Sequence, residues 1–186
     1  MDELTDEQIA AKVQKGDIDS FRILVERYES KMARYAHRFL FGPDEAKDLL
    51  QDIFVKVYVN IKSFDAKRRF SPWIYRIAHN EFVNALKKKS KERANISLFY
   101  VDVLFSHPIA KETADDAMSR RETGELLEGS LDKLGEKYRD PLVLYYLEDM
   151  DYKEIAEVLQ IPVSTVGVRL QRGKTLLKKI VEEKKP

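Results

Sequence analysis

The stretch that decides the fold of this chain comprises residues 151–174, which read DYKEIAEVLQIPVSTVGVRLQRGK. Asp151 and Glu154 have the spacing of a capping box, so a helix is predicted to begin here. The apolar residues that follow share one face of that helix and are predicted to face a core: Ile155, Ala156 and Leu159. The Gln-Ile-Pro sequence at 160–162 then predicts a short turn, with Pro162 at or near the start of a second helix.

The second helix of this motif is predicted to have two different faces. Its buried stripe comprises Val166, Leu170 and Leu177. Thr165, Arg169 and Arg172 are predicted on the opposite face, one turn apart. A recognition helix needs this arrangement, because an apolar back fixes its orientation while a polar front reaches base edges and phosphates. The pair of helices therefore indicates a DNA-binding helix-turn-helix, with an ordinary helical hairpin and a basic tail as the alternative.

The rest of the chain has helical periodicity and predicts an all-α fold. Thr5 forms a capping box with Gln8 at the start of a first helix, and Gly16 suits its end. Further helices are expected over about 20–40, 44–61 and 71–89, with Ser71 as the cap of the last one and Pro72 in its first turn. The core stripes expected in the second and third helices are Phe21, Leu24, Tyr28, Met32, Tyr35 and Phe39, and Ala46, Leu50, Ile53, Val57 and Ile61.

The helical pattern fades between the two halves of the chain and resumes near residue 118. We therefore predict two small helical domains, 1–94 and 118–186, joined by a linker at 95–117. The apolar stretch 98–105 could instead be a bound segment or a short helix.

The composition argues against several classes of protein. The chain has no cysteine, and its three histidines are far apart, so neither a metal site nor a cofactor is expected. It contains no glycine-rich phosphate loop and no nucleophile–base pair, so we do not expect an enzyme. The N-terminus is acidic and no long apolar run exists, so we expect a cytoplasmic protein with no membrane span.

Positive charge is concentrated in two short blocks. Nine Lys or Arg and two Asp or Glu occupy residues 67–93, and seven Lys or Arg and two Asp or Glu occupy residues 162–186. The remainder of the chain is net acidic. Basic blocks on helices attract polyanions, although either block alone could be a solvated surface. Because each block coincides with its own DNA-reading pattern, we favour nucleic acid as the ligand.

The first basic block also contains aromatic residues and amides. On the expected helix, Trp73, Arg76, Asn80, Asn84 and Lys87 lie along one face at spacings of three and four. Aromatic rings stack on unpaired bases, amides bind base edges and cations hold the backbone, so this face suits melted DNA. Packing in the core is the alternative role for Trp73 and for the nearby Phe70.

Taken together, the two halves resemble the group IV, extracytoplasmic-function sigma factors. The resemblance rests on FSPWIYRIA at 70–78, on YKEIAEVL at 152–159 and on the acidic helix DLLQDIFVKVY at 48–58. It covers nearly the whole chain apart from the linker. It implies a subunit that binds core RNA polymerase and directs promoter-specific initiation by recognising −10 and −35 elements and assisting promoter melting.

The resemblance also implies roles for the matching residues. Those that would bind the clamp helices of the polymerase β′ subunit are Asp48, Gln51, Asp52, Lys56 and Asn60. Those that would hold the −10 element are Phe64, Lys67, Arg68, Arg69, Phe70, Trp73, Arg76, Asn80, Asn84 and Lys87. Those that would face the −35 element are Ser164, Thr165, Arg169, Arg172 and Lys174. Other implied partners are the polymerase β flap, promoter DNA and an anti-sigma factor.

The chain departs from the family pattern at two places. Gly167 and Val168 stand where a basic residue and often a serine follow the Thr-Val pair, which alters the expected −35 contacts and places a helix-weakening glycine on the recognition helix. Gly135 stands at a position that is often proline, which should change only a turn. Two other hypotheses remain: a conventional regulator that uses only its helix-turn-helix, and a helical adaptor that binds proteins alone.

Overall fold

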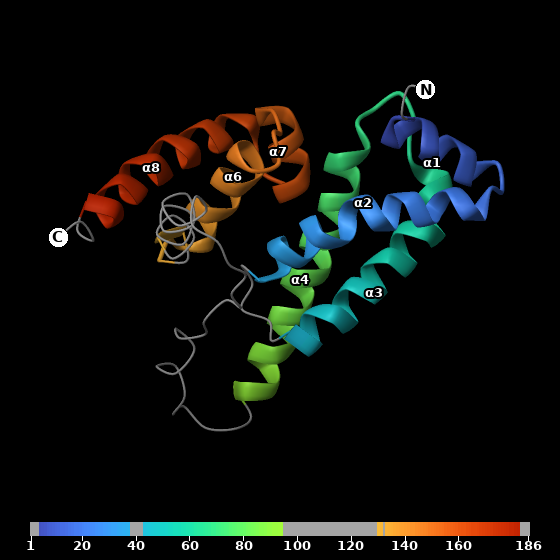
Figure 1. Cartoon of the computed structure of the whole chain (residues 1–186). Coiled ribbons are helices and arrows are strands. Elements are labelled where there is room, and N and C mark those ends of the chain that lie inside the picture. Colours follow the sequence, from blue (N-terminus) through green and yellow to red (C-terminus); the bar gives the residue numbers. More distant parts are fainter. Residues whose placement is uncertain (1–3, 38–42, 95–129, 132, 183–186) are drawn as a thin grey trace, which may run out of the picture. The chain divides into compact units, whose positions relative to one another are not determined.

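The computed structural model describes residues 4–37, 43–94, 130, 131 and 133–182, and every regular element in these ranges is a helix. The predicted all-α fold is therefore confirmed. The chain divides into two compact units, 1–103 and 104–186 (Figure 1). The predicted linker at 95–117 lies outside the described residues, so its boundaries stay a prediction.

The N-terminal unit is built from four α-helices and one 3-10 turn. In chain order these are α1 (Asp6–Gln14), α2 (Ile18–His37), α3 (Pro43–Asn60), η1 (Ile61–Ser63) and α4 (Phe70–Ala94). Helix α1 packs against α2, η1 and α4, and α3 packs against both α2 and α4 (Figure 1). The predicted capping box at the start of α1 is confirmed, since the Thr5 and Gln8 side chains each accept a hydrogen bond from the other's backbone amide. Gly16 follows α1 with a φ of +100°, a conformation that suits glycine.

The core of this unit lies along the apolar stripes predicted for α2 and α3. On α2, Leu24, Tyr28, Met32 and Tyr35 are buried and Phe21 is half-buried, while Phe39 lies outside the described residues. On α3, the whole predicted stripe is buried: Ala46, Leu50, Ile53, Val57 and Ile61, the last of which lies in η1. Helical periodicity was sufficient here because both helices pack through a single face.

Helix α4 begins earlier than predicted and is capped from a distant part of the chain. Its first residue is Phe70, so Ser71 lies inside the first turn and the prediction that it caps the helix is wrong. The amide of Phe70 instead donates a hydrogen bond of 2.9 Å to the Glu7 carboxylate on α1. A carboxylate at this end also interacts favourably with the helix dipole.

The C-terminal unit contains α6 (Glu136–Tyr146), α7 (Tyr152–Leu159) and α8 (Val163–Glu182), which all pack on one another. The capping box of Asp151 and Glu154 is confirmed. Gln160 caps the C-terminal end of α7 in a left-handed conformation, and α8 begins directly after Pro162, as predicted. Two α-helices joined by a three-residue turn thus form the predicted helix-turn-helix.

None of the described helices in either unit is long and apolar enough to cross a membrane.

Candidate nucleic-acid interface

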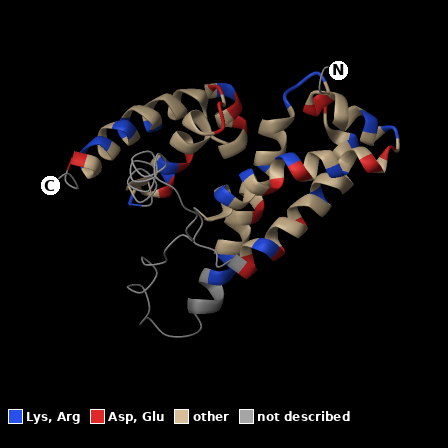
Figure 2. Ribbon diagram, viewed as in Figure 1, with Lys and Arg blue, Asp and Glu red and all other residues tan. Residues whose placement is uncertain are grey.

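Residues 65–69 connect η1 to α4 and form a short basic loop. Asp65 folds the loop into a turn, because its side chain accepts from the Lys67 amide at 3.0 Å and its carbonyl accepts from the Arg68 amide at 2.9 Å. Lys67, Arg68 and Arg69 are all exposed, and Figure 2 shows the stretch of positive charge that they place on the loop. The loop can therefore meet a polyanion without rearrangement of the helices.

Three aromatic rings lie at the two ends of this basic loop. The Phe64 and Trp73 centroids are 5.3 Å apart, and those of Phe70 and Trp73 are 5.5 Å apart. Phe64 is 5% exposed and Phe70 is fully buried, so the expectation that these two rings face DNA is wrong. Trp73 keeps a half-buried side chain. The two phenylalanines therefore support the tryptophan, which is the one ring of the three that reaches the surface.

Past Trp73, the predicted polar face continues along α4. Arg76 and Asn80 are half-buried, whereas Asn84 and Lys87 are exposed. This gradient follows from packing, because α1 binds the first residue of α4 and α2 packs against Phe70, Tyr75 and Phe82 in its first half. The polar groups nearest the basic loop are thus the least exposed.

The acidic surface predicted on α3 is exposed along its length. The exposed members are Asp48, Gln51, Asp52, Lys56 and Asn60. Lys56 forms an ion pair with Glu81 of α4, and its carbonyl accepts a hydrogen bond of 2.8 Å from Asn60. Lys56 therefore helps to hold α3 to α4, and Asn60 satisfies a carbonyl in the last turn of α3. Asp48, Gln51 and Asp52 are exposed upstream of them.

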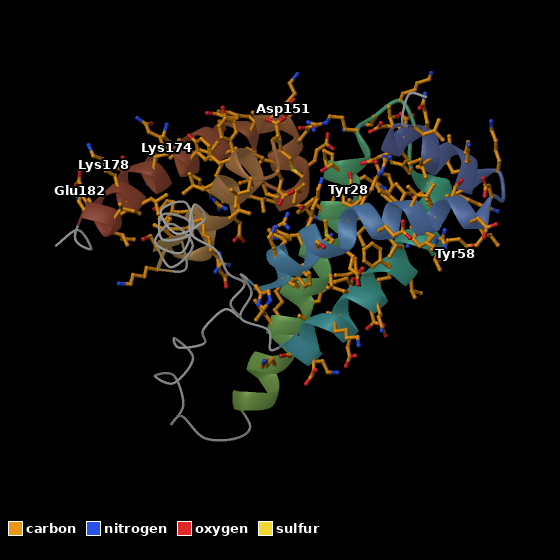
Figure 3. All side chains as sticks on the ribbon, viewed as in Figure 1. Tyr28, Tyr58, Asp151, Lys174, Lys178 and Glu182 are labelled. Atoms are coloured by element: carbon orange, nitrogen blue, oxygen red, sulfur yellow. The ribbon has the colours of Figure 1, made fainter. Side chains whose placement is uncertain are left out.

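Sequence reasoning missed three apolar residues on the outside of α3. Val55, Tyr58 and Val59 are 61%, 39% and 70% exposed. Residues 48, 52, 55 and 59 are three or four apart, so the valines continue the face of the acidic residues. Tyr58, which Figure 3 labels, also contacts Phe21 of α2, and the two ring centroids are 5.2 Å apart. The sequence contained the information needed to find them, because Val55, Tyr58 and Val59 are apolar residues outside the predicted core stripe of α3.

The outer face of helix α8 differs in detail from the predicted recognition face. Val166 and Leu170 are buried as predicted, and Leu177 is half-buried. Thr165 and Arg169 are half-buried at the border of the outer face. The exposed residues of α8 include Ser164, Val168, Arg172, Lys174 and Thr175. An apolar side chain, Val168, therefore stands in the middle of the surface expected to read DNA.

A second missed feature is a group of exposed tyrosines at the junction of α6 and α7. Tyr145 contacts Tyr146 and Tyr152 with centroid separations of 4.8 and 5.6 Å. The ammonium of Lys174 lies 5.8 Å from the Tyr146 ring centroid, and a hydrogen bond with Tyr146 raises the pKa of this lysine. Figure 3 shows Lys174 and Lys178 on α8, where Lys178 also pairs with Glu182 at 3.7 Å. The tyrosines form an exposed aromatic surface beside α8.

Both parts of the chain match known families. Residues 24–92 match Sigma-70 region 2, and residues 124–177 match Sigma-70, region 4. The first match covers the basic loop with α3 and most of α4, and the second covers the helix-turn-helix.

Individual relatives match over nearly the full length. The chain is 35% identical over 178 residues to the ECF RNA polymerase sigma factor SigW of Bacillus subtilis, with 90% of this chain and 92% of that protein covered. It is 31% identical to the RNA polymerase sigma-H factor of Pseudomonas aeruginosa, with coverage of 95% and 94%. A solved structure of the sigma factor RpoE from Bartonella quintana, in complex with the anti-sigma factor NepR, matches with a TM-score of 0.72. That match covers 90% of this chain and all of the other at 18% identity, and it shows a shared fold.

Proposed function

This chain belongs to the ECF RNA polymerase sigma factor family, and we propose that it binds core RNA polymerase and directs it to promoters through separate −10 and −35 contacts. The assignment of surfaces rests on two features of the same chain. One unit has a basic loop beside a half-buried tryptophan, and the other has a helix-turn-helix. A conventional regulator would need only the second of these.

In the N-terminal unit, we assign capture of the melted −10 element to Trp73 and the cations of the basic loop. Arg76, Asn80, Asn84 and Lys87 extend this surface along α4. Separating a base pair from its neighbour costs about 1.4 kcal/mol in stacking, and trapping one base on an aromatic ring returns about 1–3 kcal/mol. One tryptophan can thus offset only a short opening. We therefore expect the free protein to melt DNA poorly and to depend on polymerase for stable opening.

In the C-terminal unit, we assign −35 recognition to α8. Ser164 and Arg172 project outward and Thr165 and Arg169 border the same face, so they can reach base edges or phosphates in a major groove. Val168 supplies a methyl-bearing surface there, which favours contact with a thymine methyl group over a hydrogen bond.

Polymerase binding is assigned to the outer face of α3. Asp48, Gln51 and Asp52 provide acidic and polar groups, and Val55 and Val59 provide exposed apolar area beside them. An apolar centre with a polar border is the usual composition of a protein interface. We also propose a regulatory anti-sigma partner, since the Bartonella quintana relative was solved with one. Activity with polymerase would place the protein in the cytoplasm.

In vitro transcription with purified core polymerase on pooled promoter fragments tests the proposed function. We expect specific transcripts only when the protein is added. Asp48→Arg should weaken core binding, whereas Glu29→Arg, an exposed charge change on α2, should leave it intact. Salt-sensitive duplex binding without core binding or initiation would instead support a conventional regulator.

A further inference from the structure

We propose that helix α1 is a positioning element for promoter opening, in which Gln14 and Glu7 hold the two ends of the basic loop. Through the loop they set the position of Trp73 relative to the non-template strand. The inference rests on the proposed function of the loop, and it assigns a role to a helix that carries none of the DNA-contacting residues named above.

The two contacts bracket the loop. The Gln14 amide nitrogen donates to the carbonyls of Ile61 and Phe64, at 2.8 and 2.7 Å, just before the loop begins. The Glu7 carboxylate accepts from the Phe70 amide at 2.9 Å, just after the loop ends. Glu7 and Gln14 are seven residues apart, which is about two helical turns, so both side chains leave the same face of α1. One rigid helix therefore fixes the distance between the ends of the loop.

Helix α1 is itself firmly anchored to α2. The Asp6 carboxylate accepts hydrogen bonds of 2.6 Å from the Arg27 guanidinium and from the Tyr28 hydroxyl. Burial, together with the hydrogen bond to Asp6, raises the pKa of Tyr28, so its hydroxyl remains a donor at any physiological pH. The apolar side of α1 is fully packed, with Ile9 and Ala10 inaccessible to solvent. A displacement of the loop ends relative to α2 would therefore have to break the Gln14 or Glu7 contacts.

The loop ends carry the rings that support Trp73. Phe64 and Phe70 are held through their own backbone groups by Gln14 and Glu7, and both rings pack against Trp73. A shift of either end changes the packing around the tryptophan. A site that binds an unpaired base loses affinity when its side chains must first be ordered, so a preorganised loop favours opening.

The two positions require opposite chemistry, and this permits a reciprocal test. Position 7 needs an acceptor, so Glu7→Gln retains the contact and Glu7→Ala removes it. Position 14 needs a donor, so Gln14→Glu loses both contacts and brings a negative charge to two carbonyl oxygens. Gln8→Glu is the matched control, because it makes the same charge change on the same helix but preserves the acceptor that the capping box uses.

The first readout uses the free full-length protein. Trp73 is the chain's single tryptophan, so its emission maximum and its quenching by acrylamide report directly on the loop ends. We expect Gln14→Glu and Glu7→Ala to change both quantities, and Gln8→Glu and Glu7→Gln to match the wild-type protein. Far-ultraviolet circular dichroism checks that the helices are retained. If Gln14→Glu does not fold, the Trp73 emission and quenching of Glu7→Ala, compared with those of Glu7→Gln, test the positioning role of α1.

The second readout is the rate of promoter opening by the holoenzyme, measured by permanganate reactivity of thymines. We expect Gln14→Glu to open the promoter at least about tenfold more slowly, as loss of a part-buried hydrogen bond implies. Glu7→Gln should stay within about fivefold of the wild-type rate, since it loses only a charge–dipole interaction. Core binding should be equal for all variants.

The two hypotheses fail in distinguishable ways. If the wild-type protein does not open promoters with core polymerase, the proposed function is wrong, while the Trp73 signal still tests the positioning by α1. If Gln14→Glu and Gln8→Glu give the same Trp73 signal and the same opening rate, the positioning role is wrong. A slower opening with unchanged Trp73 signals also overturns it.

Discussion

Replacing Gly167 by alanine should stabilise helix α8, whereas the same replacement at Gly173 should not. In the interior of a helix, alanine is about 1 kcal/mol more favourable than glycine. A methyl group at Gly167 would meet only two carbon atoms of the Tyr152 ring, at 3.5 and 4.0 Å, which are ordinary contacts. The full gain of about 1 kcal/mol should therefore be realised at this position.

At Gly173 the same gain is opposed by the packing of α8 on α6. A methyl group there would lie 3.0 Å from a methyl carbon of Leu142 and 3.1 Å from the backbone oxygen of Tyr138. The oxygen belongs to the backbone of α6, so relief requires the two helices to separate. Overpacking of this kind costs about 1–3 kcal/mol. Gly173→Ala should therefore range from neutral to about 2 kcal/mol less stable.

Hydrogen exchange of α8 amides in the full-length protein, followed by mass spectrometry, measures both effects locally. A gain of about 1 kcal/mol corresponds to exchange about fivefold slower in Gly167→Ala. Gly173→Ala should exchange at the wild-type rate or faster. If both variants slowed exchange equally, the close α6–α8 contact would not control stability here. If neither variant slowed exchange, Gly167 would not weaken helix α8.

Four further predictions concern DNA, stability and acid. Trp73→Ala should slow promoter opening in a permanganate assay, because about 1–3 kcal/mol of base stacking is lost, and unchanged opening by the folded variant would remove Trp73 from the −10 surface. Phe64→Ala should instead lower the free energy of unfolding, measured in urea, by about 3–5 kcal/mol because Phe64 is buried. Arg172→Ala should reduce the salt dependence of duplex binding by about 0.9 in log–log slope if the exposed guanidinium meets a phosphate, and an unchanged slope would argue against that contact. Hydrogen bonds from the hydroxyl and amide of Ser20 lower the pKa of Asp17, so their stabilisation is present above the ordinary pKa of an aspartate and is lost as the pH falls through the lowered value. Between about pH 5 and pH 2, the urea concentration at the midpoint of unfolding should therefore fall less for Ser20→Ala than for the wild-type protein. An equal fall in both proteins would contradict the stabilisation of Asp17 by Ser20.

Several elements could be predicted from sequence because their determinants are local. The capping boxes at Thr5 and Asp151 each involve residues three positions apart, and the structure contains both. The core stripe of α3 could be derived from its period, since one face of that helix is buried. The helix-turn-helix likewise depends on a short segment whose helices, turn and apolar faces lie within about thirty residues of one another.

The remaining features depend on which segments meet in three dimensions. Aromatic residues among cations suggested an exposed surface at Phe64 and Phe70, but both rings are buried, with Phe70 packed against Tyr28 of α2, and composition does not reveal this. The start of α4 was misplaced because its cap, Glu7, is 63 positions away in the chain.

The sequence by itself determined most of the helices, most of their inward faces and the order of two DNA-binding units, because capping and periodicity act within a turn or two. Only the tertiary structure decided which aromatic ring reaches the surface, where glycine permits close helix packing, and that α1 holds both ends of the basic loop. Burial and long-range hydrogen bonds are properties of pairs of segments, and a local pattern carries no information about its partner.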